Sequence, residues 1–142
     1  MFFKKNPSLD QLNSSLTAVI DRHCEMIITK INDAEKSIKA EIVVNEKVLQ
    51  PFGLLHGGVT CLLAESLGSL AGNLTLESGF VAVGQSLNAN HVSSGRLSDK
   101  IQINGTNIHW GRRSQIWQID FTNGEKLVSR IYLTLMNLES KR

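Results

Sequence analysis

Five residues of one short segment have the types and spacing of a catalytic site. The segment reads "QPFGLLHGGVTCLLAESLGSLAG" over residues 50–72, and its candidates are Gln50, His56, Gly57, Glu65 and Ser69. Glu65 is the only acid in the segment and is surrounded in sequence by Leu, Ala, Gly and Ser. An ionised carboxylate among apolar neighbours is costly without partners, and such groups recur as nucleophiles and general bases. Glu65 is therefore a candidate for either role.

The His-Gly-Gly sequence predicts a second half of the site at the start of a helix. The first N–H groups of a helix have no acceptor within it, and the helix dipole is positive at that end. A carbonyl oxygen oriented toward the N–H of Gly57 would be polarised, and a glycine has no side chain to block it. His56 could orient the loop or hydrogen-bond a substrate, and Gln50 is a polar residue in an apolar turn. Both also fit purely structural roles.

The helix that must carry Glu65 is expected over about residues 57–77, ending before Gly79. Ser69 follows Glu65 by one helical turn and shares its face. The large apolar residues of this helix form a stripe that we expect to face a sheet: Val59, Leu62, Leu63, Leu67, Leu70 and Leu74. Small residues line the other side, where they would admit a ligand or the helix of a second subunit: Cys61, Ala64, Gly68, Ser69 and Gly72.

Alternating apolar and polar residues predict strands around this helix. They are expected at 24–31, 37–44, 81–94, 99–110, 114–122 and 126–139. An N-terminal amphipathic helix is expected over about 8–22, opened by a capping box of Ser8 and Gln11. The pattern favours an α+β fold in one domain, residues 1–142, with an antiparallel sheet wrapped around the long helix. Such a sheet has open edges, so we expect self-association.

The composition fits a globular protein and narrows the range of partners. The chain has 142 residues, of which 42% are hydrophobic and 20% charged, enough for one core. A net charge of +2 argues against nucleic acid as the main partner but allows a local basic patch for a small anion. No apolar run has the length of a signal peptide or a membrane span, so we expect a cytoplasmic protein. Cys24 and Cys61 have no metal-ligand spacing and read as buried thiols, so no metal site is expected.

Together with "NANHVSSGR" and "HWGRRSQIWQIDF" downstream, the segment resembles the hotdog-fold acyl-CoA thioesterases. The resemblance covers about residues 35–139. It is greatest to 1,4-dihydroxy-2-naphthoyl-CoA hydrolases, enterobactin-pathway proofreading thioesterases and 4-hydroxybenzoyl-CoA thioesterases of the Arthrobacter type. It implies the hotdog fold and hydrolysis of an aromatic acyl-CoA. The leading candidate substrate is 1,4-dihydroxy-2-naphthoyl-CoA of menaquinone biosynthesis. No cofactor is implied, because CoA is part of the substrate.

The resemblance also implies a role for each candidate residue. Glu65 would attack the thioester carbonyl or activate water, and the N–H of Gly57 would polarise the carbonyl oxygen. Gln50 and His56 would hold the thioester or the water, and Ser69 would position the water or the carboxylate. In the family, Gln50 and His56 come from one protomer and Glu65 from its partner. A homotetramer built as a dimer of dimers is implied.

Basic residues are needed to bind the phosphates of CoA. His91, Arg96, Arg112 and Arg113 lie in segments that bind the nucleotide or the pantetheine in this family, although each alone could be a solvated strand-end residue. Ser93 stands where close relatives often have a basic residue. Neighbouring strand residues point to opposite faces, so Arg112 and Arg113 cannot both face one cleft unless the turn twists them together. We expect one of them, with Arg113 slightly favoured, to meet a phosphate.

Other functions fit parts of the pattern. An aryl carrier protein could replace CoA as the thiol carrier, as in the proofreading thioesterases. Some hotdog domains bind acyl-CoA without hydrolysing it and serve as sensors in regulators. Hotdog dehydratases use a similar long helix but need a histidine and an acid in another arrangement. The presence of Glu65 and the lack of a DNA-binding segment favour the enzyme.

Overall fold

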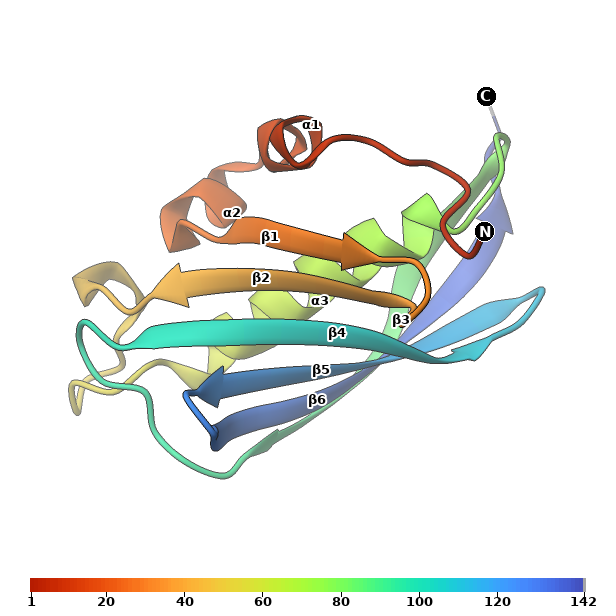
Figure 1. Cartoon of the computed structure of the whole chain (residues 1–142). Coiled ribbons are helices and arrows are strands. Elements are labelled where there is room, and N and C mark those ends of the chain that lie inside the picture. The colour runs from red at the N-terminus through yellow and green to blue at the C-terminus, as the bar shows by residue number, and fades with distance from the viewer. Residues whose placement is uncertain (142) are drawn as a thin grey trace.

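A single antiparallel sheet of six strands forms the body of the molecule, and one long helix lies against one of its faces (Figure 1). The computed structural model describes residues 1–141. The strand order is β1-β2-β4-β5-β6-β3. The strands are β1 Ile27–Asn32, β2 Ser37–Val43, β3 Phe80–His91, β4 Lys100–Trp110, β5 Ser114–Asn123 and β6 Lys126–Glu139. The expected α+β arrangement, a sheet around a central helix, is confirmed.

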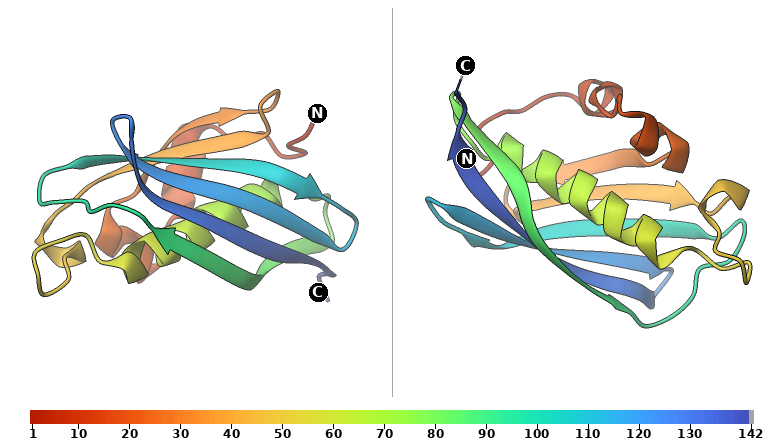
Figure 2. Two further views of the ribbon diagram at one scale, coloured as in Figure 1. Left: turned by 90° about the horizontal axis from the view of Figure 1, so that it is seen from below. Right: turned by 180° about the vertical axis from the view of Figure 1, so that it is seen from behind.

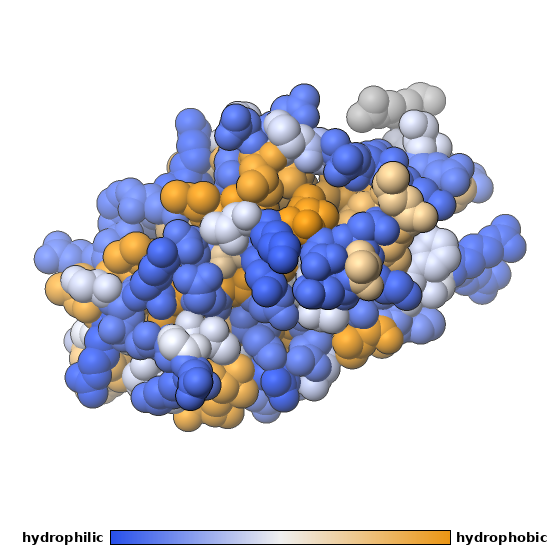
Figure 3. All heavy atoms as spheres, viewed as in Figure 1, coloured by the Kyte–Doolittle hydropathy of each residue, from blue (hydrophilic) through white to orange (hydrophobic). Residues whose placement is uncertain are grey.

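Helix α3, Gly57–Leu74, crosses the sheet, and β3 curves along one side of it (Figure 2). Inward-facing side chains of β2, β4, β5 and β6 pack beneath the helix, and the fully buried ones include Trp117, Phe121, Ile103, Ile119 and Leu133. The opposite face of the sheet, seen in Figure 3, is mainly polar. There Asp120 and Arg130 form a two-bond ion pair across β5 and β6, with both N–O distances at 2.8 Å.

The buried face of α3 combines part of the expected leucine stripe with small residues expected on the other side. Leu63, Leu67 and Leu74 are buried as expected. Ala64, Gly68 and Gly72 are buried as well, whereas Leu62 and Leu70 are only half-buried. A Cβ on Gly68 would lie 2.5 Å from Leu133 Cδ2 and 3.0 Å from Ile119 Cδ1. The glycines therefore allow the helix backbone to approach the large side chains of the curved sheet, because bulk on the strands replaces bulk on the helix.

The N-terminal helix expected over 8–22 is two shorter helices, α1 Leu9–Ser15 and α2 Val19–Cys24. The capping box of Ser8 and Gln11 is present. The hydroxyl of Ser15 donates to the Leu12 carbonyl at 2.7 Å, and the helix stops at Leu16. Serine and threonine side chains compete with the helix for backbone groups, so this Ser- and Thr-rich stretch breaks although its leucines keep helical spacing.

Helix α3 ends three residues earlier than the expected limit of 77. Thr75 is its C-cap, and the Thr75 hydroxyl donates to the Gly72 carbonyl at 2.7 Å. Gly79, expected to stop the helix, instead has φ +90° in the turn that leads into β3. The end of the helix is covered by the N-terminal segment, whose Lys4 and Lys5 amides both donate to the Leu74 carbonyl.

The two edges of the sheet differ. At β1, the side chain of Asn13 in α1 accepts from the Ile28 N–H at 2.7 Å and donates to the Ile28 carbonyl at 3.0 Å, which caps that edge. At β3, 12 residues long, the Asn73 side chain of α3 makes a similar pair of bonds to the backbone of Ala82, both at 2.9 Å, but no strand within residues 1–141 pairs with the outer edge. Phe80, Val81 and Val83 of this strand are exposed. A long edge strand with exposed apolar side chains and no partner strand is a site for pairing with another strand.

Two further expectations concern the thiols and the membrane. Cys24 is buried and Cys61 half-buried, and burial raises the pKa of both thiols. Both are therefore protonated at neutral pH and pack as small hydrophobic side chains.

Among residues 1–141, no helix combines the length and the apolar character that crossing a membrane requires.

Candidate active site

The start of α3 presents one free backbone donor. His56 is the N-cap of the helix, and its Nδ1 accepts from the Gly58 N–H at 2.8 Å. Within residues 1–141 the Gly57 N–H donates to no backbone or side-chain acceptor. His56 thus satisfies the second glycine and leaves the first as the amide available to a ligand. The imidazole orients the loop, which is one of the two roles that the sequence left open.

Gln50 lies in the tight turn that leads to this helix. Its backbone N–H donates to the Leu54 carbonyl at 2.7 Å, and its side-chain oxygen accepts from the Phe52 N–H. Gly53 has φ +78°, a conformation that glycine adopts without strain. The Gln50 oxygen therefore holds the turn. Its side-chain amide remains a donor at the wall of a small cavity that it shares with Gly57.

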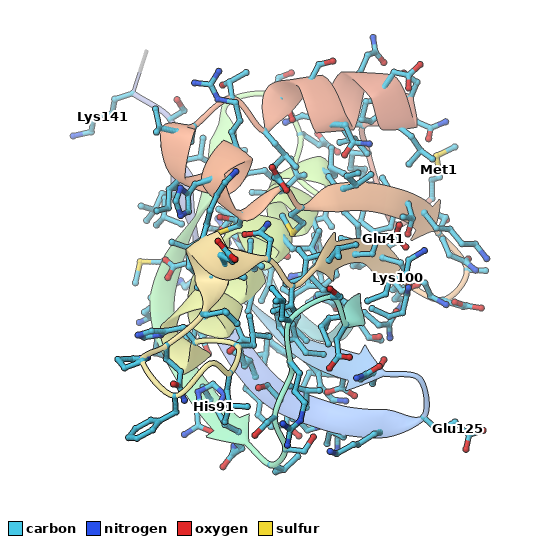
Figure 4. The ribbon with its side chains drawn as sticks, turned by 90° about the vertical axis from the view of Figure 1, so that its left-hand side faces the viewer. Met1, Glu41, His91, Lys100, Glu125 and Lys141 are labelled. Carbon is cyan, nitrogen blue, oxygen red and sulfur yellow. The ribbon has the colours of Figure 1, made fainter. Side chains whose placement is uncertain are left out.

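The cavity has a volume of about 180 Å³ and lies between the start of α3 and the end of β3. His91, the last residue of β3, lies below the loop that leads into α3 (Figure 4). Its Nδ1 is 2.8 Å from the Ser129 hydroxyl. A Cβ on Gly57 would lie only 2.8 Å from His91 Nε2, so the imidazole packs directly against this glycine. Gln50, Gly57 and His91 are thus brought together around one cavity.

Glu65 lies in a different hollow of about 170 Å³, with residues 84–87 of β3 and Leu133. Its carboxylate lies over Gly84, where a Cβ would overlap Oε1. The side chain is exposed in the single chain, not enclosed by apolar groups as expected. It points away from the buried face of α3, toward the uncovered edge of the sheet. Ser69 is half-buried one turn further along α3.

The two hollows are separated along the helix. Gly57 and Glu65 are eight residues apart in α3, which corresponds to about 12 Å along the helix axis. One thioester carbonyl cannot contact the Gly57 N–H and the Glu65 carboxylate of the same chain at that separation. The parts of the predicted site are therefore divided between two places on one molecule.

The expected phosphate-binding residues also divide into two groups. Arg96 is exposed. Its backbone forms an isolated antiparallel β-bridge with Leu54 of the Gln50 turn, so it lies near His91 and the first hollow. Arg112 and Arg113 line a cavity of about 480 Å³ at the opposite end of the sheet. The Arg113 carbonyl accepts from the Asn137 N–H, whereas His91 pairs with Ser129, eight residues earlier on β6. That interval spans about 26 Å of strand.

Both arginines line the same cavity, which alternation allows only if the turn twists them together. Residues 111–113 form the turn between β4 and β5 and belong to neither strand, so strand alternation does not apply to them. Asn137 Nδ2 donates to the Gly111 carbonyl at 3.0 Å and to the Arg112 carbonyl at 3.4 Å, which fixes the turn. Trp110 and Phe80 also line this cavity.

Three residues near the candidate site carried no clear signal in the sequence. The Thr60 hydroxyl donates to the Gly57 carbonyl at 2.8 Å, and Thr60 is buried. Ser129 is buried beside His91, and Gly84 makes room for the carboxylate. Thr60 follows Gly57 by one helical turn and could have been found from that spacing. Ser129 and Gly84 depend on the strand register. Within residues 1–141, no three His, Cys, Asp or Glu side chains gather as ligands for a metal ion.

Comparisons with known proteins agree with this fold. Residues 52–129 match the Thioesterase superfamily. The proofreading thioesterase EntH of Cronobacter sakazakii is 37% identical over 122 residues, 84% of this chain and 85% of that protein. A crystal structure of a thioesterase from Haemophilus influenzae is similar with a TM-score of 0.92 and 38% identity, and the match covers 100% of this chain and 98% of that one.

Two variants of one Staphylococcus aureus protein have also been crystallised, one with a glutamine and one with a glutamate replaced by alanine. Their TM-scores to this chain are 0.76 and 0.77, at 29% and 27% identity. The matches cover 82% and 84% of this chain and 95% and 98% of those chains.

A long helix inside a curved antiparallel sheet, with a free amide at the helix start and a carboxylate on the helix, defines a hotdog-fold thioester hydrolase. The chain belongs to the Thioesterase superfamily.

Proposed function

We propose that the protein hydrolyses aromatic acyl-CoA thioesters at a site built from the start of α3 in one subunit and Glu65 of a second. The observation that carries this proposal is the division of the catalytic groups. The free Gly57 N–H and the Glu65 carboxylate lie in separate hollows of one chain, about 12 Å apart along α3. A second copy can bring one hollow of each chain together.

The uncovered strand β3 supplies a route for this assembly. Gly84 lies against Glu65, and His91 lies against Gly57, so both hollows border the same edge strand. If β3 pairs antiparallel with β3 of a second copy, centred between Leu87 and Asn88, Gly84 lies opposite the partner's His91. By two-fold symmetry the other pair of hollows meets in the same way. The dimer then has two equivalent sites, and we expect two dimers to form a homotetramer.

The proposed chemistry follows from these groups. The thioester carbonyl oxygen accepts from the Gly57 N–H, which stabilises the negative charge that develops there during attack. The partner's Glu65 either takes a proton from an attacking water or attacks the carbonyl carbon itself. In the first route the oxygen of water bonds to carbon and the C–S bond breaks, releasing a carboxylic acid and the thiolate of CoA. In the second, water then cleaves the anhydride formed with Glu65.

The remaining candidates would bind and orient. The free side-chain amide of Gln50 can donate to the thioester, and the half-buried Ser69 lies one turn from Glu65, where it can orient the water. The S. aureus variants support roles for Gln50 and Glu65. Their replaced glutamine and glutamate are as far apart in that sequence as Gln50 and Glu65 are in this one.

The pantetheine arm and the phosphates of CoA would be bound by basic residues at the protein surface. His91 lines the first hollow, and Arg96 lies beside it, where it could contact the pantetheine arm of a substrate bound there. Arg112 and Arg113 are too far from that hollow in the same chain to share its substrate. They would reach a CoA phosphate only in an assembly that brings their cavity near a site of another subunit.

The substrate class rests on the resemblance to aroyl-CoA hydrolases, with 1,4-dihydroxy-2-naphthoyl-CoA as the leading candidate. That reaction would belong to menaquinone biosynthesis in the cytoplasm. The similarity to a proofreading thioesterase favours a second candidate, an aryl group carried by a carrier protein. A non-catalytic acyl-CoA-binding module is the third reading.

One assay separates these readings. The purified protein is given a panel of aroyl-CoA, alkanoyl-CoA and aryl-carrier-protein thioesters, and released thiol is measured. We expect the highest kcat/KM for an aroyl-CoA. A higher value for the carrier-protein thioester would favour proofreading, and a preference for long-chain alkanoyl-CoA would overturn the aromatic assignment. Binding of acyl-CoA without hydrolysis of any thioester would make the protein a binding module.

A further inference from the structure

The His91 side chain is held in one orientation by a hydrogen bond to a buried hydroxyl. It is the last residue of β3 and lies directly opposite Ser129 in the β3–β6 ladder. Cross-strand neighbours of this kind are close enough for their side chains to interact. The His91 Nδ1 is 2.8 Å from the Ser129 hydroxyl oxygen, and Ser129 is only 1% exposed. One edge of the imidazole is thus held by a buried hydroxyl, and the other edge faces Gly57.

The hydrogen-bond partners determine which nitrogen of His91 carries the proton. The Thr60 hydroxyl donates to the Gly57 carbonyl at 2.8 Å and lies 3.5 Å from His91 Nδ1. The buried Ser129 hydroxyl has one acceptor within reach in residues 1–141, which is His91 Nδ1. A buried hydroxyl proton needs an acceptor, so Ser129 donates to Nδ1. The neutral imidazole therefore carries its proton on Nε2.

The Nε2–H lies beside the free amide at the start of α3. A Cβ on Gly57 would be 2.8 Å from His91 Nε2, and the Gly57 nitrogen is about 2.5 Å from that Cβ position. The two donors are therefore close enough to share one oxygen acceptor at about 3 Å from each. His91 and Gly57 both line the 180 Å³ cavity, where such an oxygen would lie.

Resting on the function proposed above, we infer that His91 Nε2–H and Gly57 N–H together form a two-donor oxyanion hole, with Ser129 as the positioning residue. The imidazole donates a hydrogen bond to the carbonyl oxygen as water or Glu65 attacks the carbon. It transfers no proton, and both donors return to their resting state when the C–S bond breaks. His91 then acts mainly on the transition state, a role distinct from gripping the pantetheine arm.

The test compares two replacements of His91. His91→Phe keeps a ring against Gly57 and removes the donor, whereas His91→Gln keeps an N–H donor near the Nε2 position. Loss of one oxyanion donor lowers kcat by about 10² to 10³. We expect a loss of that size for His91→Phe with KM changed less than about twofold, and recovery of at least tenfold in His91→Gln. Ser129→Ala should lower kcat about tenfold, because the imidazole loses the bond that fixes its proton on Nε2.

Two further measurements keep the outcome unambiguous. His109→Phe, at an exposed histidine near the far end of β4, is the matched control and should keep wild-type turnover. A thioether analogue of the substrate, which has no reacting carbonyl, should bind wild-type protein and His91→Phe equally. Weaker analogue binding by His91→Phe with unchanged kcat would overturn the inference and leave His91 as a binding residue. Equal loss of kcat in His91→Phe and His91→Gln would also overturn it. Failure of the wild-type protein to hydrolyse any thioester would refute the proposed function itself.

Discussion

A site divided between two subunits can be tested by mixing two inactive proteins. Glu65→Gln removes the carboxylate and leaves the start of α3 intact. Gly57→Pro removes the free N–H and fills the first hollow but leaves Glu65 intact. Proline is favoured at the first residue of a helix, and His56 before it has the extended backbone, φ −67° and ψ 125°, that proline requires. The new ring displaces the His91 imidazole, whose Nε2 lies 2.8 Å from a Cβ at this position, but His91 is exposed and can move. Both variants should therefore fold.

The expected activities follow from the separation of the two hollows. Alone, Glu65→Gln should lower turnover by about 10² to 10⁴, because the nucleophile or base is lost. Gly57→Pro should lower it by about 10² to 10³ through the lost oxyanion donor. In a mixed dimer, one of the two sites combines the intact Gly57 of one chain with the intact Glu65 of its partner. Random pairing makes half of the dimers mixed, so about a quarter of wild-type turnover should return.

The assay uses chains that exchange freely before dimers form. The two variants are unfolded together in urea, refolded by dilution, and assayed with an aroyl-CoA by release of thiol. Each variant refolded alone is the control, and circular dichroism checks that α3 has formed. A mixture no more active than the sum of the two variants would refute the divided site. It would then follow that one chain closes the 12 Å gap by itself, by a rearrangement of α3 or of the bound substrate.

Further variants test other parts of the structure. Gln115→Leu should lower the free energy of unfolding, measured in urea, by about 2 to 4 kcal/mol, because it leaves the buried Trp117 N–H without its acceptor; a change below about 1 kcal/mol would contradict this. Gly84→Ala should displace the Glu65 carboxylate and lower kcat about tenfold or more while stability changes by less than about 0.5 kcal/mol. A stability loss that accounts for the lower activity would count against it. Arg112→Ala and Arg113→Ala should raise KM for acyl-CoA without changing kcat, and less so at high salt; a collapse of kcat would assign them to the chemistry.

The strands were the most predictable part of the fold. Alternation in β2, β4, β5 and β6 reflects one face packed on α3 and one face in water, so the pattern carries the structure directly. The orientation of α3 was not predictable in the same way. Both the leucine side and the glycine side of this helix are plausible packing surfaces. The choice depends on the size of side chains on strands far away in sequence, such as Leu133 opposite Gly68.

The candidate site could likewise be predicted only in part. The roles of the candidate residues follow from the resemblance, and the start of α3 follows from His-Gly-Gly and the rules of helix ends. The contact of His91 with Gly57 does not follow, because it depends on where β3 ends and on its register with Ser129. The position of Arg112 and Arg113 on one cavity does not follow from strand alternation either, because both residues lie in a turn.

The strand order also constrains how the chain can be made. Within the described residues, β3 has β6 as its sole strand neighbour, and β6, 14 residues long, is the last of the strands to be translated. During synthesis, β3 leaves the ribosome before β4, β5 and β6 exist, and it must wait unpaired while they are translated. An unpaired apolar strand in a nascent chain is prone to aggregate. Chains that stop before β6 would expose both β3 and β5, so premature termination near the C-terminus should yield insoluble fragments rather than a smaller folded protein.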